Sequence, residues 1–460
     1  MPREKVEAVT KAAARRGVIM AQLGDTWDHV FHSVRADLRM SNKQKSIMDR
    51  ASASKAAMGV GVMAAPLPAL VEYALTKDAE PGGLAKITVK FSEKTVLTIT
   101  RTSVEIKSDM CIWRGTVDGT SAPATLMWWP GGKMAGTVQH EGRIYTIRHM
   151  GGELHAVVEM AEDRMPREHA PMPARVRAND PNLRDDPLVQ QGEANMLRRM
   201  VTATHPSWRQ RLRATKAVQA TAALLPLKGR AARARAAPSS KDVVIDVMVV
   251  YTRRAAGYYG DIRRELIHLA IEEGNESFRK SNLGHIKLRL VHAYETDYVE
   301  KGEHFEHLYR MVDKGDGHME DVHGWRDKYR ADVVVLVVDD AAGCGLATRV
   351  YADADEAFAV VHHECAATSY SIAHEIGHII GARHDLNLDK TMTPFPYGHG
   401  YVNGTKWRDI MSYKESCNGC PRVPVWSSPN VLVKGEPAGA PDLDNARVIM
   451  EQAARVASFR

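Results

Sequence analysis

The chain has 460 residues, of which 44% are hydrophobic and 26% are charged, a composition typical of soluble globular proteins. This length is too great for one ordinary hydrophobic core, so we expect two or three domains joined by linkers. Charge is unevenly distributed: the first 241 residues carry a net charge of +14, and residues 242–460 carry −8. A nucleic-acid-binding half would explain this difference, but we favour two oppositely charged parts of one chain that attract each other.

Residues 1–80 are expected to form a leader that is helical or flexible. No signal peptide follows Met1, but from Met40 a basic stretch precedes a small apolar run over residues 56–70, as in a secretory signal. An alanine-rich helix would explain this run equally well. The run is too short to span a bilayer as a mature helix, so we expect no stable membrane insertion. A signal that starts at Met40 would make the protein secreted, in the periplasm or outside the cell.

Residues 81–168 contain short runs rich in β-formers, such as KITVKF, TVLTIT, ATLMWW and RIYTIR, separated by Gly, Asp and Ser. This spacing predicts a small, mostly antiparallel β domain. Residues 169–241 follow as a linker rich in Pro and Arg. Its part from Ala194 to Lys241 lacks Asp and Glu and is expected to be exposed and open to proteolysis. Because aromatic residues are nearly absent from that part, apart from Trp208, we expect no nucleic-acid partner.

Residues 242–460 have the pattern of an α/β (α+β) fold, with a mixed sheet, helices and a loop-rich C-terminal subdomain. Apolar runs predict buried strands, and apolar residues three and four apart predict helices. A short edge strand is expected at residues 357–361. The predicted strands are 243–251, 286–294 and 331–338, and the predicted helices are 263–281, 304–312, 371–380 and 443–459.

The helix predicted at 371–380 opens the stretch SIAHEIGHIIGARHD, which places titratable rings in an apolar segment. His374 and His378 are four residues apart, so they lie one turn apart on one helix face and can bind one zinc ion. If the helix continued, His384 would lie about 9 Å further along its axis. Gly381 can end the helix and turn the chain, so that His384 becomes the third ligand.

Three histidine ligands leave a fourth position on zinc for water, whose pKa the metal lowers towards 7. Glu375 lies one residue further round the helix, within reach of that water but not as an obvious ligand. We assign Glu375 as the general base that takes the proton of this water. These residues suit hydrolysis assisted by one catalytic Zn²⁺.

The pattern His-Glu-x-x-His-x-x-Gly-x-x-His-Asp resembles the signature of the metzincin clan of zinc peptidases at every fixed position. The clan also has a methionine turn downstream, for which DIMSY supplies Met411. With CGLA, HGY and SSPNV, these motifs look most like the reprolysin-like bacterial group that includes peptidyl-Asp metallopeptidases. The resemblance covers residues 242–434, and a weaker one makes residues 85–168 similar to the prodomain of that group.

The resemblance implies a zinc-dependent endopeptidase that hydrolyses protein or peptide substrates, with Glu375 passing the proton of the water to the leaving amine. It also implies a zymogen whose own propeptide acts as an intramolecular inhibitor until cleavage near residues 230–241. It implies that Met411 forms a hydrophobic floor beneath the histidines. Tyr413 stands where related enzymes have a tyrosine that binds zinc at rest and later donates to the oxyanion, but ordinary packing is an equal alternative. Asp385 is expected to anchor the loop by hydrogen bonds.

Four of the five cysteines lie in the C-terminal half, which suits two disulfides and an oxidising compartment. Cys344 and Cys365 flank one segment and are expected to pair, and Cys417 and Cys420 are expected to form the second disulfide. Reduced, buried cysteines are the alternative. Cys111 could place a thiolate on zinc and keep a zymogen silent, but we favour a buried thiol in a strand.

Asp353 and Asp355 could hold calcium, although a solvated acidic loop is favoured because no EF-hand pattern is present. Two other functions fit the same residues. An exported or injected toxin would direct the same chemistry at one narrow protein target, and a zinc-stabilised binding module would leave Glu375 idle. We favour a peptidase, since a purely structural zinc site has no need of Glu375. We also expect the protein to be a monomer.

Overall fold

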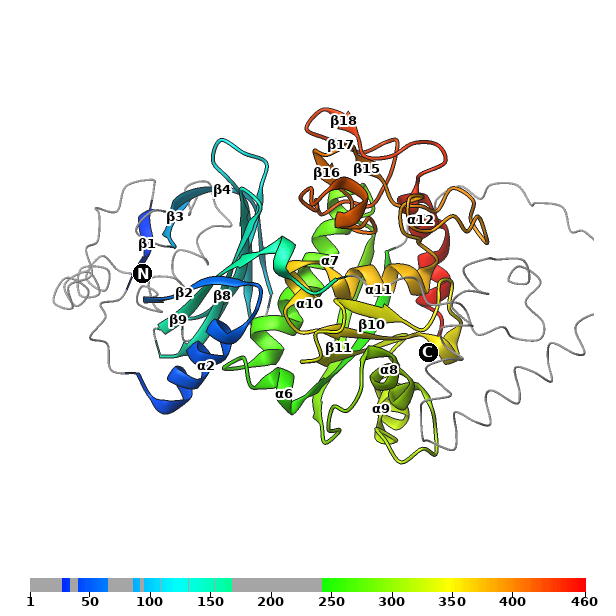
Figure 1. Ribbon diagram of the computed structural model, residues 1–460, viewed down its shortest axis with the longest axis horizontal. Helices are drawn as coiled ribbons and strands as arrows, with labels where there is room; N and C mark the ends of the chain where they lie inside the picture. Colours follow the sequence, from blue (N-terminus) through cyan, green and yellow to red (C-terminus); the bar gives the residue numbers. More distant parts are fainter. Residues whose placement is uncertain are drawn as a thin grey trace, which may run out of the picture. The chain divides into compact units, whose positions relative to one another are not determined.

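The structure is a computed structural model that describes residues 27–33, 40–64, 86–91, 95–107, 109–130, 132–152, 154–167 and 242–460 (Figure 1). The linker predicted at 169–241 and most of the predicted leader lie outside the described residues. The chain forms two compact units, here called the barrel unit and the sheet unit. The barrel unit consists of Met1–Pro166, Arg253–Glu273 and His363–Ser369, and the sheet unit of Arg167–Thr252, Gly274–His362 and Tyr370–Arg460.

The barrel unit contains a closed β-barrel of nine strands among the described residues. Neighbouring strands are antiparallel, except that β1 pairs with β3 in parallel and so closes the barrel. Buried apolar side chains fill its interior, among them Ile99, Trp113, Leu126, Val138 and Ile147. The strands are β1 (Trp27–Ser33), β2 (Ala57–Ala64), β3 (Lys86–Lys90), β4 (Val96–Ile106), β5 (Cys111–Val117), β6 (Pro123–Trp129), β7 (Lys133–His140), β8 (Arg143–Gly151) and β9 (Leu154–Ala161).

The barrel begins earlier in the chain than the predicted β-rich segment, 81–168. Helix α2 (Asn42–Ala53) starts at a capping box in which the Ser41 side chain accepts from Gln44 N–H. The apolar run of residues 56–70 is not an alanine-rich helix over its described part, because Ala57–Ala64 is strand β2 and pairs with β9. Two glycines and two valines alternate in AMGVGVMA, which disfavours a helix and suits a strand.

The sheet unit is built on a five-stranded sheet in the order β11-β10-β12-β14-β13. Its strands are parallel except for β13, which is antiparallel to β14. The prediction of an edge strand at 357–361 is wrong, since β14 lies inside the sheet and all five of its residues are buried. The strands are β10 (Val243–Thr252), β11 (Ile286–Thr296), β12 (Val333–Val338), β13 (Gly345–Ala347) and β14 (Phe358–His362).

Two helices of the sheet unit, α8 and α9, pack against this sheet. Side chains of α8 and α9, including Phe305, Leu308 and Val322, form one core cluster with Met248 and Val334 of the sheet. The predicted helix 263–281 is present, but its first turns are a π-helix, η3. The helices of residues 242–460 are α6 (Arg253–Ala256), η3 (Arg263–His268), α7 (Leu269–Lys280), α8 (His304–Val312), α9 (Asp321–Tyr329), α10 (Cys365–Thr368), α11 (Ser371–Ile380) and α12 (Asn445–Val456). Of these, α6, η3, α10 and the start of α7 belong to the barrel unit.

The remaining elements are short. Three are 3-10 turns: η1 (Glu162–Arg164), η4 (Ala354–Glu356) and η5 (Lys414–Cys417). Four more are two-residue strands in the loop-rich part that follows α11: β15 (Val402–Asn403), β16 (Trp407–Arg408), β17 (Leu432–Val433) and β18 (Glu436–Pro437).

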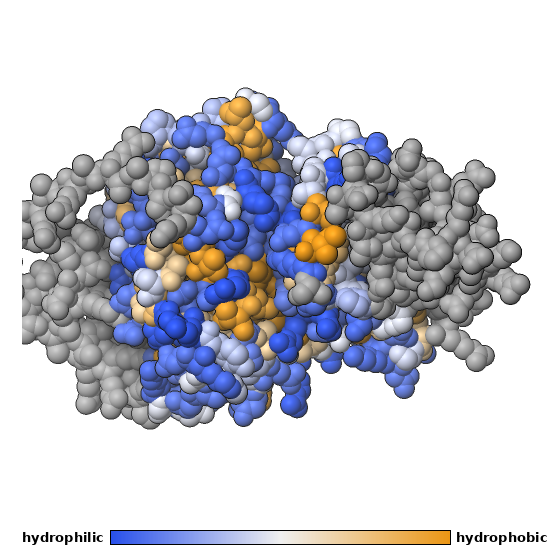
Figure 2. Space-filling view, turned by 180° about the vertical axis from the view of Figure 1, so that it is seen from behind, coloured by the Kyte–Doolittle hydropathy of each residue, from blue (hydrophilic) through white to orange (hydrophobic). Residues whose placement is uncertain are grey.

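Hydrophilic residues dominate the face shown in Figure 2, and hydrophobic residues gather there in a few places between them. No helix within the described ranges is long and apolar enough to cross a membrane.

Candidate metal centre

Helix α11 carries the histidine motif and ends at the predicted glycine. All residues of Ser371–Ile380 are buried, and the next residue, Gly381, has φ 135° and ψ 3°. Glycine adopts such a positive φ at little cost, whereas a residue with a side chain does not, so Gly381 lets the chain leave the helix axis. The last two helix carbonyls, of Ile379 and Ile380, accept hydrogen bonds from the guanidinium of Arg455 on α12.

The turn at Gly381 brings three imidazoles together. Nε2 of His384 lies 3.1 Å from Nε2 of His374 and 2.9 Å from Nε2 of His378. All three residues are buried. In the part of the chain that the structure describes, these histidines are the one group whose ligand atoms lie close enough to share a metal ion. The structure thus brings together the three histidines that the sequence singles out.

Hydrogen bonds on the far side of two rings decide which nitrogen is available to a metal. His374 Nδ1 donates to the Ile410 carbonyl and His378 Nδ1 donates to the Ala382 carbonyl, both at 2.9 Å. Because a carbonyl oxygen only accepts, the ring protons sit on Nδ1, and the Nε2 lone pairs face His384. Burial, together with neighbouring positive charge, lowers the pKa of His378 and of His384 well below the usual value. The rings of His378 and His384 are therefore neutral, the form in which histidine binds zinc.

This donor set fits a zinc ion. Two Nε2 lone pairs point at a third Nε2, and a single proton on His384 Nε2 can bond to only one of them. A cation at the convergence point removes the repulsion between the lone pairs, and neutral imidazole nitrogens are ligands that Zn²⁺ prefers. The Nδ1 bonds to backbone carbonyls also hold the rings of His374 and His378 in ligand orientation, as outer partners of metal-bound histidines do.

Glu375 follows the first histidine on α11 and is 2% exposed. Its carboxylate lies against edge strand β13, because a Cβ added to Gly345 would collide with Glu375 Oε1. Glycine at position 345 therefore leaves room for the carboxylate beside the sheet edge. A titratable oxygen, the histidine cluster and an edge strand thus come together in one unit.

The segment around Met411 packs against α11. Met411 is fully buried, and its Sδ lies 3.4 Å from the position that a Cβ on Gly377 would occupy. The Tyr413 ring is packed edge-on against His384, with 4.5 Å between ring centroids. Asp385 Oδ2 accepts the backbone N–H of Tyr413 at 3.1 Å, so the residue after the third histidine ties its loop to the methionine turn.

Sequence reasoning missed two charged residues beside this turn. Asp409 is fully buried, and its carboxylate accepts from Ser412 Oγ at 2.6 Å and from Ser427 N–H at 3.1 Å; burial raises its pKa to about 6. Arg422 is 4% exposed, donates to the Ser412 carbonyl at 3.2 Å, and adds to the positive charge that lowers the pKa of His384. Little in the sequence pointed to these two residues, because they stand among other charged residues such as Arg408, Lys414 and Glu415.

The cysteines have the expected states. Cys417 and Cys420 form a disulfide, and Cys344 and Cys365 are also disulfide-bonded. Cys111 is a buried thiol in the barrel core.

The acidic loop gives no support to a calcium site. Asp353 Oδ1 accepts the backbone N–H of Asp355, and among the described residues metal-binding atoms come together in the histidine cluster and not in this loop.

Comparison with known proteins agrees with this geometry. A reprolysin model of metallo-peptidase family M12 matches residues 241–426. A peptidyl-Asp metalloendopeptidase of Xanthomonas campestris pv. campestris is 36% identical over 332 residues, which are 72% of this chain and 68% of that protein. One of Stenotrophomonas maltophilia is 34% identical over 335 residues, covering 72% and 69%. A protein of the same name from Pseudomonas fragi is 31% identical over 190 residues, 41% of this chain and all of that protein. The chain therefore belongs to the reprolysin-like bacterial metallopeptidases of family M12 and is a zinc metalloendopeptidase.

Proposed function

We propose that His374, His378 and His384 hold one catalytic zinc ion and that Glu375 is the general base of an endopeptidase made as a zymogen. The observation that carries this proposal is the convergence of three Nε2 atoms, with a buried carboxylate on the adjacent helix position. A structural zinc site would not require that carboxylate, which is why we prefer the peptidase to an idle binding module.

When bound, zinc supplies a Lewis acid that polarises the scissile carbonyl and makes water acidic enough to attack near neutral pH. Glu375 takes the proton of the attacking water and passes it to the leaving amine. Its place against Gly345 puts the carboxylate beside the strand to which an extended substrate would pair. Tyr413 packs on His384 and would donate its hydroxyl proton towards the carbonyl oxygen as negative charge develops there.

We propose that the barrel is the prodomain and that the chain leaving it restrains the enzyme. The backbone N–H of Cys344, directly before edge strand β13, donates to the Arg167 carbonyl at 2.8 Å. The chain just after the barrel thus occupies a hydrogen-bonding position next to the strand that we assign to substrate. Cleavage within residues 169–241 would free this edge, and secretion would place the active enzyme outside the cell.

We also propose that the substrates are proteins cut next to aspartate, because the curated relatives are named peptidyl-Asp metalloendopeptidases. Arg422 supports this choice, since its guanidinium lies by the methionine turn and bears electrostatically on His384. A buried arginine is well suited to bind a carboxylate. Peptides that differ only by Asp or Asn beside the scissile bond should be separated by at least tenfold in kcat/KM, and Arg422→Met should remove that preference.

Two measurements test the core of the proposal. Casein hydrolysis by linker-cleaved protein should be abolished by a zinc chelator and lowered by several orders of magnitude in Glu375→Ala. Elemental analysis should find one zinc per chain in the wild type and in Glu375→Ala, and none in His384→Ala. Full activity of Glu375→Ala would refute the base assignment, and full zinc content of His384→Ala would refute the ligand set. N-terminal sequencing of protein from the culture medium tests secretion and locates the cleavage site.

A further inference from the structure

The barrel unit includes a piece of the peptidase sequence. Residues 253–273 lie within the family match, 241–426, yet they form one compact unit with the barrel, which lies outside that match. The covalent connection between the barrel and this piece runs through residues 168–241. Once the linker is cut, only non-covalent contacts hold the barrel to residues 253–273. The contacts that would keep the cut barrel in place can therefore be identified residue by residue.

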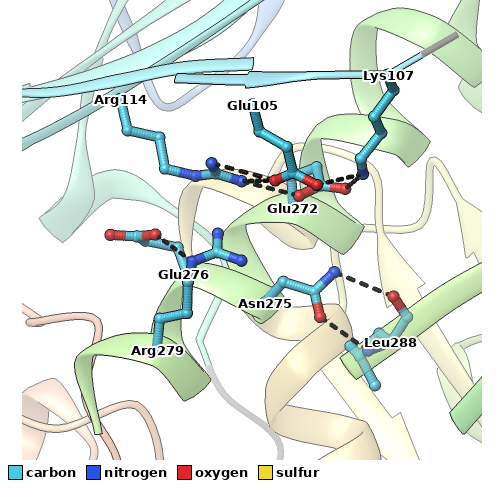
Figure 3. A network of polar contacts seen from close by, with 8 residues as sticks. All are labelled: Glu105, Lys107, Arg114, Glu272, Asn275, Glu276, Arg279 and Leu288. Carbon is cyan, nitrogen blue, oxygen red and sulfur yellow. Dashed lines mark hydrogen bonds and ion pairs between the residues drawn. The ribbon is translucent and has the colours of Figure 1, made fainter. Parts of the chain in front are cut away.

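The strongest of these contacts centre on Glu272, in the first turn of α7. Arg114 of β5 donates from Nη2 to Glu272 Oε2 at 3.0 Å, although the two residues are 158 positions apart. Lys107 contacts the other carboxylate oxygen, Oε1. Glu105 pairs with the same Arg114 at 3.3 Å and with Lys107 at 3.7 Å, so two cations and two anions form one balanced network (Figure 3).

The ion pair between Arg114 and Glu272 is the buried part of this network. The side chains of Arg114 and Glu272 are only 4% and 5% exposed. A charge removed from water to this extent needs a partner, because breaking a buried pair leaves the other charge uncompensated. The next residue, Glu273, is also buried, and Thr137 of β7 donates a hydrogen bond to its carboxylate. Two consecutive carboxylates of the peptidase region thus lie buried with partners on barrel strands.

Helix α7, which carries Glu272, is fixed to the sheet and also carries a second glutamate that can serve as a control. Asn275 donates to the Leu288 carbonyl at 3.0 Å and accepts the Leu288 N–H at 2.7 Å, which ties the helix to strand β11. Glu276 lies one turn after Glu272 but pairs with Arg279 of its own helix at 2.9 Å. Figure 3 shows this second pair beside the Asn275 contacts, within the same helix that carries the network.

We propose that Glu272 and Glu273 form a docking site for the barrel on the peptidase region, and that the barrel stays bound through it after the linker is cut. This inference rests on the proposed zymogen, in which the barrel is the prodomain. Activation then takes two steps, cleavage of the linker followed by dissociation of the barrel. The second step depends on salt, because ion pairs hold the complex and the Lys107 side chain is 34% exposed.

The test uses the full chain in a Glu375→Ala background, with a site-specific protease site inserted within residues 228–240. The cut protein is diluted in steps and analysed by size-exclusion chromatography. We expect the cut wild type and the matched control Glu276→Gln to elute as one complex over the same concentration range. Glu272→Gln and Arg114→Met should each raise the concentration at which the fragments separate by at least tenfold.

The double variant Glu272→Gln/Arg114→Met should be no weaker than the worse single variant, because both changes remove the same pair. Fragments of Glu272→Gln that stay together as tightly as the wild type would overturn the docking site, as would equal weakening by Glu276→Gln. Thermal melts of the uncut variants show whether each one folds, and Arg114→Met tests the contact from the barrel side if Glu272→Gln does not fold. Because the readout is association, it does not depend on activity. If the barrel docks as expected, but cut protein that retains Glu375 lacks zinc-dependent activity, the proposed function alone is refuted.

Discussion

Gly377 lies between the two helical histidines, and the structure leaves no room there for a larger residue. A Cβ at this position would lie 2.6 Å from two ring carbons of Trp426. Carbon atoms in ordinary contact are about 3.5–4.0 Å apart, so Gly377→Ala must move the ring or the helix by about 1 Å. The ring resists such a shift, because its Nε1 donates to Ser277 Oγ at 2.9 Å and it stacks on Phe278.

Two effects of opposite sign decide the size of the loss. Overpacking of a core costs about 1–3 kcal/mol. The higher helix propensity of alanine offsets up to about 1 kcal/mol of that cost. We therefore expect Gly377→Ala to lower the free energy of unfolding by between about 0 and 3 kcal/mol, with a central value of about 1.5 kcal/mol. Casein hydrolysis should fall as well, since the same shift displaces the helix that carries His374 and His378.

Gly324, in the middle of α9, is the matched control. A Cβ there meets nothing within 4 Å, so only helix propensity acts. Gly324→Ala should raise the free energy of unfolding by about 0.5–1 kcal/mol and leave casein hydrolysis unchanged. Urea titrations of the two variants and the wild type measure both values. If Gly377→Ala proved as stable as Gly324→Ala, contact between Trp426 and α11 would not limit the residue at position 377.

Three further predictions concern pH, the barrel thiol and the metal. Burial raises the pKa of Glu265 to about 8, so the folded protein keeps a proton that the unfolded chain releases above pH 4.5. The contribution of Glu265 to the free energy of unfolding is therefore greatest below pH 4.5, and it declines by up to about 1.4 kcal/mol per pH unit towards pH 8. Glu265→Gln should flatten this decline in thermal melts. An unchanged slope would mean that other groups cause the decline. Cys111→Ala should leave the latency of the uncut chain unchanged, because the thiol lies in the barrel core; activity in that variant would support a cysteine switch instead. Chelation of zinc should lower the Tm, because the ion binds only the folded histidine cluster, and a Tm unaffected by chelator would contradict that cluster as the metal site.

Much of the site could be predicted because local rules determine it. Helix periodicity places His374 and His378 on one face, and a glycine at 381 is the residue that permits the turn after the helix. Asp385 directly follows the third histidine. The inferences about the helix, its turn and Asp385 need only a few consecutive residues, whereas Met411 is identified through the resemblance to the methionine turn of the metzincin clan.

What the sequence did not reveal depends on pairing between distant residues. Strand β2 belongs to the barrel because it pairs with β9, some hundred residues later in the chain, and no local pattern specifies that partner. Likewise β14 looks like a short edge strand until β13, only three residues long, takes the edge position. The contacts of Arg422 and Glu272 have the same character, since their charges gain a role only when the chain folds around them.

The guanidinium of Arg455 clamps the end of α11 from a helix that the ribosome makes long after the third histidine. A nascent chain that already contains every proposed ligand still lacks this support for two helix carbonyls. The carbonyls of Ile379 and Ile380 therefore gain these hydrogen bonds only after α12 has been synthesised and has folded onto α11.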